Sequence, residues 1–252
     1  MSPGRQDEQE PYLPRAASSG SQAGVGSSSS KTAPQHSGKR SVYPKTPRRL
    51  KQIEAKRTAI LDAALGLFSR FGLHGTTVEQ IAEQASVSKT NLFYYFASKE
   101  EVYVAVLRRL LDQWLAPLRA LERDSDPVKG IGDYIRRKVE FSRSHPEASR
   151  LFCLEIVQGA PLLRGELETS LKELVDAKAE VIRAWVVEGR LSPVDPHHLI
   201  FAIWSTTQHY ADFAVQIGAL LNTGLDDSQF AEEAVRNIQR IILDGVRTRP
   251  LA

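Results

Sequence analysis

Apolar residues recur at helical spacing from about residue 52 almost to the end of the chain, and short polar breaks separate the runs. No stretch alternates apolar and polar residues over the length of a useful β-strand. The pattern therefore predicts an all-α protein with about nine helices, three before residue 98 and about six after it. The two clearest stripes are Ile60, Ala64, Leu67, Phe68 and Phe71 on the first helix, and Val102, Val106, Leu110, Leu111, Trp114 and Leu118 on the helix after Ser98.

Several helix boundaries can be located from short-range signals. Asp126-Pro127 and Asp195-Pro196 each pair an N-cap residue with a proline in the first helical turn. Pro146 is a further helix start, and Pro117 should kink the long helix after Ser98 or end its regular part.

Residues 76–103 predict two short helices joined by a tight turn, followed by a third helix. Thr77 and Gln80 have the spacing of a capping box, and residues 86–88 supply the short polar residues of a turn and a new N-cap. Residues 89–96 then form the second short helix, with Leu92, Phe93 and Phe96 on its apolar face. A second capping box at Ser98 opens the next helix.

The short second helix begins with Lys89, Thr90 and Asn91, whose side chains can reach base edges and phosphates in the major groove. This pattern predicts a helix-turn-helix in which the second helix reads DNA. The alternative is an ordinary pair of core helices with a polar turn. It explains the apolar stripes, but it explains less well why Tyr94 and Tyr95 lie beside these polar residues.

The segment from Arg57 to about Leu107 resembles the DNA-binding domain of the TetR family of transcriptional regulators. The matching stretches are residues 58–68, 71–77, 78–82 and 92–96. The resemblance implies a three-helix DNA-binding domain over residues 52–97. It also implies that Thr77, Tyr94, Tyr95 and Lys99 touch phosphates, and that Ser88, Lys89, Thr90 and Asn91 lie at or near the bases.

Composition adds the cellular context. The chain has 252 residues, 42% of them hydrophobic, which is enough for a sizeable core. It has no run of about 18 apolar residues and no signal-peptide pattern, so we expect a cytoplasmic protein with no membrane partner. Cys153 is the only cysteine, which excludes a disulfide within the chain and a cysteine cluster for zinc.

Charge is distributed unevenly along the chain. Residues 1–57 hold 11 basic and 4 acidic residues, whereas the remaining 195 hold 22 basic and 26 acidic residues. Residues 1–46 are rich in Ser, Gly, Pro and Gln, which predicts disorder. The basic excess peaks between Lys39 and Arg57, directly before the predicted DNA-binding domain. A solvated linker would have this composition too, but the position favours an arm that binds the DNA backbone.

Residues 98–249 are predicted to form a helical ligand-binding and dimerisation domain. The last two helices, roughly 195–217 and 227–247, carry apolar residues beyond one stripe. Such helices bury one face in the core and the other against a partner. We therefore expect a homodimer that reads palindromic double-stranded DNA, as TetR-like proteins do. The alternative is that both faces serve one monomeric core.

A ligand site is suggested by Trp114, and by Trp204 and Gln208 one turn apart on a later helix. Two indoles can sandwich a flat heterocycle, and an amide can pair with its polar edge. All three could also be core or interface residues, although a buried amide needs partners.

Four segments of this domain, residues 111–118, 148–155, 159–163 and 198–214, resemble a TetR-family regulator of pyrimidine utilisation. The resemblance implies uracil or thymine as the effector and adds Phe152 and Glu155 as candidate pocket residues. Glu155 could be a pocket acid, or it could form an ion pair with Arg150 or another base.

Other chemistry is less well supported. His197, His198, His209 and Asp212 do not form a convincing set of metal ligands, so we expect surface or capping histidines and no metal. Cys153 has no evident His and acid partners and is expected to be a small buried residue. No cofactor is predicted. Two other classes of protein remain open: a DNA-binding architectural protein without an effector, and an enzyme with a pyrimidine-like substrate, against which the lack of an acid–base or nucleophile set argues.

Overall fold

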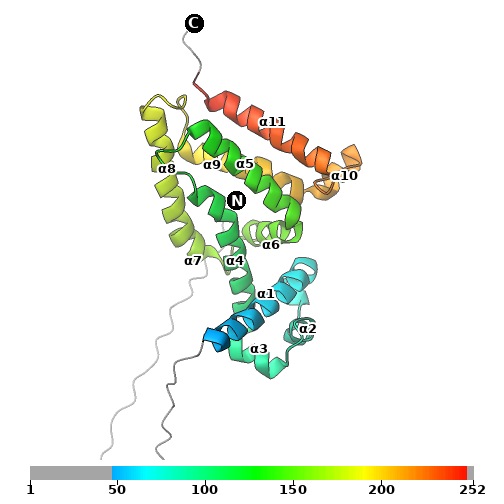
Figure 1. The fold of residues 1–252 in the computed structure, drawn as a ribbon. Helices are drawn as coiled ribbons and strands as arrows, with labels where there is room; N and C mark the ends of the chain where they lie inside the picture. Colours follow the sequence, from blue (N-terminus) through cyan, green and yellow to red (C-terminus); the bar gives the residue numbers. More distant parts are fainter. Residues whose placement is uncertain (1–46, 249–252) are drawn as a thin grey trace, which may run out of the picture. The chain divides into compact units, whose positions relative to one another are not determined.

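The computed structural model describes residues 47–248, and every regular element in that range is a helix (Figure 1). The all-α prediction is confirmed for this part of the chain. The tail predicted to be disordered, residues 1–46, lies outside the described residues. No helix in the described range is long and apolar enough to cross a membrane.

Three helices form the N-terminal part: α1 (Pro47–Gly75), α2 (Val78–Gln84) and α3 (Lys89–Tyr95). Gly72 interrupts α1 with a φ of 67°, a left-handed conformation that favours glycine. Thr77 and Gln80 form the predicted capping box, with hydrogen bonds of 2.8 and 3.2 Å. The capping box therefore sets the start of α2.

The second part begins with α4 (Lys99–Arg119), which Ser98 caps through the backbone N–H of Glu101. Pro117 lies in the last turn of α4, and the helix ends two residues later, as the sequence predicted. The remaining helices are α5 (Pro127–Ser144), α6 (Pro146–Val157), α7 (Arg164–Glu166), α8 (Lys172–Val187), α9 (Pro196–Asp212), α10 (Ala214–Leu221) and α11 (Ser228–Val246), with a π-helical segment (Leu167–Leu171) between α7 and α8.

Local capping signals were accurate guides to these boundaries. Asp126 and Asp195 accept hydrogen bonds from the backbone N–H groups of Lys129 (2.7 Å) and His198 (2.9 Å). The number of helices was underestimated. The expected helix over 195–217 is in fact α9 and α10, which meet at Phe213, where φ is −113° and ψ is 30°. Neither Gly nor Pro marks this break, so the sequence carried no signal for it.

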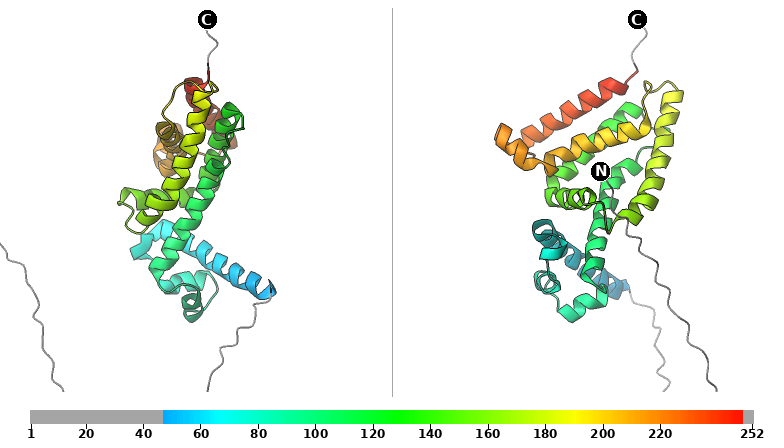
Figure 2. Two further views of the ribbon diagram at one scale, coloured as in Figure 1. Left: turned by 90° about the vertical axis from the view of Figure 1, so that its left-hand side faces the viewer. Right: turned by 180° about the vertical axis from the view of Figure 1, so that it is seen from behind.

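Helix α4 belongs to two packed regions. Its N-terminal half packs against α1, and its later residues pack against α5, α6 and α8 (Figures 1 and 2). Tyr103 of α4 meets Phe68 of α1 edge-on, with ring centroids 5.0 Å apart. Beyond Leu110, the same helix buries Trp114 and Leu118 in the second region. One continuous helix therefore connects the helix-turn-helix to the rest of the described chain.

Helix α5 lies against both α9 and α11, and α8 also packs on α9. Most of the apolar residues predicted for the last two helices are buried within the chain, including Leu199, Ile203 and Ile238. The prediction of a second apolar face is wrong for most of α11, whose outer face is polar apart from Ile241, which is 70% exposed. Helix α9 does expose Phe201, at 49%.

Candidate functional site

Two sites were predicted from the sequence, and the first is the surface of α3. Leu92 and Phe96 are buried, which anchors α3 against α1 and α2, while Lys89 and Thr90 are exposed and Asn91 is half-buried. Phe93 was expected on the buried face but is 42% exposed. It lies one residue, about 100° of helical turn, from Leu92, and a seven-residue helix buries only one narrow stripe.

The tyrosines of α3 extend this polar surface. Tyr94 is 66% exposed, and its ring meets that of Tyr95 edge-on with centroids 5.2 Å apart. Lys89 is paired with Glu79 of α2 at 2.5 Å, an exposed ion pair that contributes little to stability. Glu79 has a pKa below its usual value, and the hydrogen bond from Lys89 is the main cause.

The remaining predicted DNA contacts hold the local backbone. The hydroxyl oxygens of Thr77 and Ser88 accept the capping bonds of α2 and α3. Lys99 Nζ donates to the carbonyl of Thr76 at 2.8 Å and so joins the start of α4 to the start of α2. The structure thus gathers all eight predicted residues on or beside the two helices of the helix-turn-helix.

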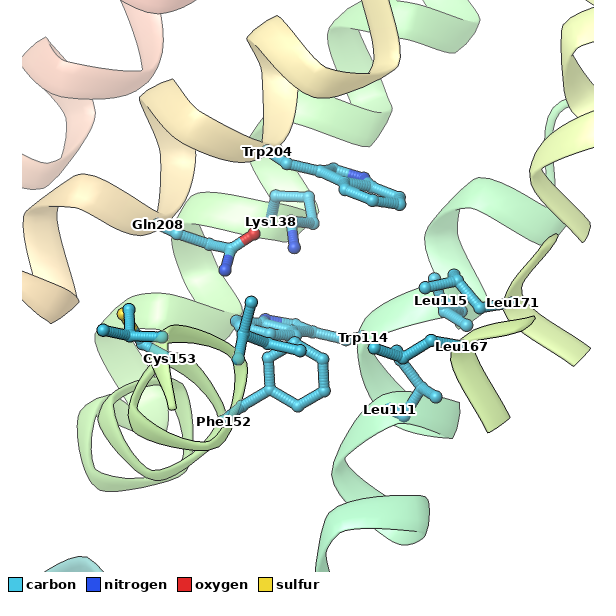
Figure 3. Close-up of a pocket in the computed structure, with 12 residues that line it drawn as sticks. Leu111, Trp114, Leu115, Lys138, Phe152, Cys153, Leu167, Leu171, Trp204 and Gln208 are labelled. Atoms are coloured by element: carbon cyan, nitrogen blue, oxygen red, sulfur yellow. The ribbon is translucent and has the colours of Figure 1, made fainter. Parts of the chain in front are cut away.

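The second site is a cavity of about 330 Å³ in the second part of the chain (Figure 3). It is lined by four of the five residues predicted for the ligand site: Trp114, Phe152, Trp204 and Gln208. Figure 3 shows Trp204 of α9 and Trp114 of α4 on opposite sides of the cavity. The rest of the lining is mostly apolar: Leu111, Leu115, Ile156, Val157, Leu167 and Leu171, together with Cys153 and Lys138.

The ring of Phe152 on α6 packs against the indole of Trp114. The two rings meet edge-on, with centroids 4.8 Å apart. The indole N–H of Trp114 is buried and has no hydrogen-bond partner among the described residues. Since an unpaired buried donor is costly, this N–H is a candidate partner for a ligand oxygen.

Trp204 differs from Trp114 in this respect. Its indole N–H donates to the hydroxyl oxygen of Tyr134, at 2.5 Å. Tyr134 lies on α5, is 1% exposed and has a pKa raised by burial. This hydrogen bond fixes the orientation of Trp204 on the wall of the cavity.

Lys138 of α5 was not predicted from the sequence, yet it is the one cation in the lining of this cavity. Its side chain is 2% exposed, and Nζ lies 4.1 Å from the centroid of the Trp114 ring, a cation–π geometry. Burial lowers the pKa of Lys138 to about 7, and the nearby carboxylate of Asp212 opposes this shift. Asp212 itself accepts a hydrogen bond from Ser149, and burial raises its pKa.

Glu155 does not line the cavity. It is 2% exposed and accepts hydrogen bonds from the Tyr103 hydroxyl (3.1 Å) and the Leu162 backbone N–H (2.9 Å). Among the described residues, Glu155 forms no ion pair with Arg150, which was one of the predicted alternatives. Its carboxylate accepts the hydrogen bond from Tyr103 instead. Glu155 therefore joins α6, the loop after it and α4.

The weaker chemical candidates can be placed as well. No group of three or more His, Cys, Asp and Glu side chains within residues 47–248 could hold a metal ion. Cys153 is half-buried at the edge of the cavity, and burial raises its pKa, which disfavours the reactive thiolate.

Together, the capped helix-turn-helix and the polar surface of α3 define a DNA-binding protein, and the separate apolar cavity offers space for a small molecule. The family model for bacterial regulatory proteins of the tetR family matches residues 60–106, and the model for the C-terminal region of YcdC-like proteins matches residues 107–249. The chain belongs to the TetR family and is a DNA-binding transcriptional regulator. Regulators of this family bind operator DNA as dimers and respond to small-molecule effectors.

The chain is similar to the HTH-type transcriptional regulator RutR of Escherichia coli (strain K12). The two are 56% identical over 204 residues, which is 81% of this chain and 96% of RutR. The HTH-type transcriptional repressor NicS of Pseudomonas putida is 25% identical, over 81% of this chain and 98% of NicS.

Among solved structures, the ketosteroid transcriptional regulator KstR2 of Mycobacterium tuberculosis has the same fold. Its TM-score is 0.60 at 22% identity, covering 77% of this chain and 96% of KstR2. The recognised relatives are regulators, and such proteins are generally not enzymes.

The pKa of Lys138 gives a testable pH dependence. A lysine in the unfolded chain keeps its proton up to about pH 10.4, whereas folded Lys138 loses it from about pH 7. Between these values the unfolded state binds more protons, so the free energy of unfolding should rise with pH. The difference in the free energy of unfolding between the parent protein and Lys138→Met should rise by up to about 1.4 kcal/mol per pH unit between pH 7 and 10.

Urea unfolding of both proteins at pH 7, 8, 9 and 10 measures this difference. The matched control is Lys129→Met, which removes an exposed lysine of the same helix. Parallel stability curves for the parent protein and Lys138→Met would show that the buried lysine keeps an ordinary pKa.

Proposed function

We propose that this protein is a homodimeric repressor that binds a palindromic operator and is released by a flat heterocycle such as uracil or thymine. Its regulon would serve pyrimidine or nitrogen metabolism. The observation that carries the effector assignment is the cavity between Trp114 and Trp204, into which the Gln208 amide and the Lys138 amine also point (Figure 3).

The chemistry of this cavity suits a pyrimidine base. The indole face of Trp204 can stack on a planar ring. A pyrimidinedione carries C=O acceptors and N–H donors around that ring, and the Gln208 amide can both donate and accept. The Trp114 N–H and the Lys138 ammonium supply further donors for carbonyl oxygens. The resemblance of the pocket segments to a regulator of pyrimidine utilisation supports the same class of ligand.

The coupling from ligand to DNA runs through α4. Trp114 contacts the ligand from the same helix that packs Tyr103 on Phe68 of α1. A ligand that prefers one tilt of α4 would therefore change the position of the helix-turn-helix, and in a dimer it would change the spacing of the two α3 helices. The effector acts only through its different affinities for the two arrangements.

The dimer proposal rests on apolar side chains that the described chain leaves exposed. Phe201 on α9 and Ile241 on α11 are 49% and 70% exposed, and these helices lie next to each other (Figure 2). Phe213, between α9 and α10, is 51% exposed. A second copy of the chain that covers these residues would remove them from water.

Effector binding should depend on the amide of Gln208. Isothermal calorimetry should detect saturable binding of uracil or thymine to the parent protein. Gln208→Leu keeps the side-chain size but removes the polar edge, and it should weaken binding by about 10- to 100-fold. Trp204→Ala should abolish detectable binding, and exposed Val187→Ala serves as the control.

Unsubstituted pyrimidine, which lacks both carbonyl groups, is the matched control ligand and should bind much more weakly. If neither uracil nor thymine binds the parent protein, the effector proposal fails while the assignment as a DNA-binding regulator is unaffected.

Sequence recognition should depend on Asn91. In the cap of α3, the backbone N–H of Asn91 donates to the Ser88 hydroxyl, and this bond does not involve the Asn91 side chain. The substitution Asn91→Ala should therefore preserve the helix. The test uses a DNA duplex that the parent protein selects from a random pool. The variant should bind this duplex with a binding free energy about 1–3 kcal/mol less favourable, and its preference at one base pair should be relaxed. The control is Asn237→Ala on α11, and binding is measured by fluorescence anisotropy. An unchanged ratio of selected to random duplex affinity would remove Asn91 from the base-reading set.

Dimerisation should depend on the exposed apolar residues of α9 and α11. The double variant Phe201→Asp and Ile241→Asp places carboxylates in the proposed interface, where burial would desolvate them. We expect it to be a monomer at concentrations where the parent protein is a dimer, as measured by sedimentation velocity. Val187→Asp on α8 should leave the parent state unchanged, and a dimeric double variant would exclude this interface.

A further inference from the structure

The first turns of α1 carry a charge pattern that the helix-turn-helix itself does not require. Within residues 48–57 there are five basic side chains and one acidic side chain, Glu54. All except Arg57 are exposed, and Arg57 is half-buried. The buried stripe of α1 begins only at Ile60, so the preceding turns add almost nothing to the core. In the left-hand view of Figure 2, this end of α1 points away from the other helices.

The base of this extension is fixed against the DNA-binding core. The guanidinium of Arg57 lies 5.1 Å from the centroid of the buried Phe96 ring, at the end of α3. Phe96 also closes α3 by donating its backbone N–H to the carbonyl of Leu92. The direction of the extension is therefore set relative to the recognition helix.

The extension and the recognition helix share one surface groove. This groove is lined from α1 by Arg49, Gln52, Ile53, Ala55 and Lys56, and from α3 by Asn91, Tyr94 and Tyr95. A second hollow continues along α1 and is lined by Arg48, Lys51, Gln52 and Ala55. Gln52 and Ala55 line both, so the hollows adjoin. Basic side chains thus extend directly from the helix-turn-helix surface along one side of α1.

The length of this basic face suits the DNA that flanks a binding site. Residues 47–57 span about 16 Å at about 1.5 Å per helical residue, compared with a minor groove about 6 Å wide. Placing α3 in the major groove would bring the face of α1 that lines the shared groove toward the sugar-phosphate backbone at the edge of that major groove. Arginine and lysine in this position neutralise phosphates and release bound counterions.

We propose that the N-terminal extension of α1 is a second DNA-binding element, which binds phosphates of the duplex flanking each half-site. The inference rests on the proposed operator binding by α3. Its contribution is independent of sequence: it adds affinity, whereas α3 supplies the choice of site. Arg48, Arg49 and Lys51 are the principal contacts, and the basic residues that precede Pro47 in the sequence continue the same charge.

The test compares the triple variant Arg48→Gln, Arg49→Gln and Lys51→Gln with a control of equal charge change. The control is Lys129→Gln, Arg137→Gln and Arg183→Gln, which removes three exposed basic residues from α5 and α8. Affinity is measured from 50 to 300 mM salt on three duplexes. These are a 40-base-pair duplex centred on the palindrome that the parent protein selects, the same palindrome without flanks, and a random 40-base-pair duplex.

We expect the α1 variant to bind the 40-base-pair palindrome about 10- to 100-fold more weakly at physiological salt. The slope of log affinity against log salt should become shallower by about 5, at about 0.9 per lost phosphate contact and three contacts in each subunit of the dimer. The defect should shrink on the palindrome without flanks, and the ratio of specific to random affinity should not change. A separate double variant, Arg48→Lys and Arg49→Lys, should bind as tightly as the parent protein, because the phosphate contacts require charge.

Equal affinity and equal salt slope for the α1 variant and the control would overturn the inference. A defect that is equally large without flanks would also overturn it, because the contacts would then lie inside the half-site. If the parent protein selects no palindrome, operator recognition by α3 fails instead, and the salt slopes on the random duplex still decide whether α1 binds phosphates.

Discussion

The arrangement of this protein depends on the shared burial of one helix, α4, in two packed regions. Its N-terminal half is buried against α1, through Tyr103 and its neighbours, and its later turns are buried against α5, α6 and α8. A close-packed interface does not deform freely, so it favours a few discrete arrangements over continuous bending. Any shift of α4 at Trp114 must therefore be accommodated at the packing of Tyr103 on Phe68, which makes the helix a physical connection between two distant surfaces.

A second connection reinforces the first. Helix α6 carries Phe152, which supports the Trp114 indole, and Glu155, which accepts the Tyr103 hydroxyl hydrogen bond. These two residues lie three positions apart, so they project from neighbouring sides of the same helix. The contacts from Phe152 through Glu155 and Tyr103 to Phe68 form a continuous path of packed and hydrogen-bonded groups. Such a path can carry coupling when its members have two alternative arrangements.

The sequence predicted those features that depend on neighbours along the chain. The caps at Thr77, Ser98, Asp126 and Asp195 are local hydrogen-bond patterns, so the start of each helix could be read directly. The indoles and Gln208 were found because two of them share a helical face. Lys138 could not be found, because a lysine on an amphipathic helix is usually solvated and only the packing of α5 against α9 encloses it. The same limit applies to the Phe213 break and the exposed Phe93, which depend on contacts between distant segments.

The hydrogen bond between Trp204 and Tyr134 has a consequence for what the protein reports to the cell. With its N–H already bonded, Trp204 offers a bound molecule only its flat face, an interaction with little directional preference. Discrimination is left to the opposite edge, where the donors of Trp114, Gln208 and Lys138 converge. Molecules that present the same carbonyl edge but carry different small substituents beside Trp204 would then be sensed together. Under the proposed function, the regulator would respond to the combined abundance of a group of related heterocycles, and its output would follow that pool instead of any single member.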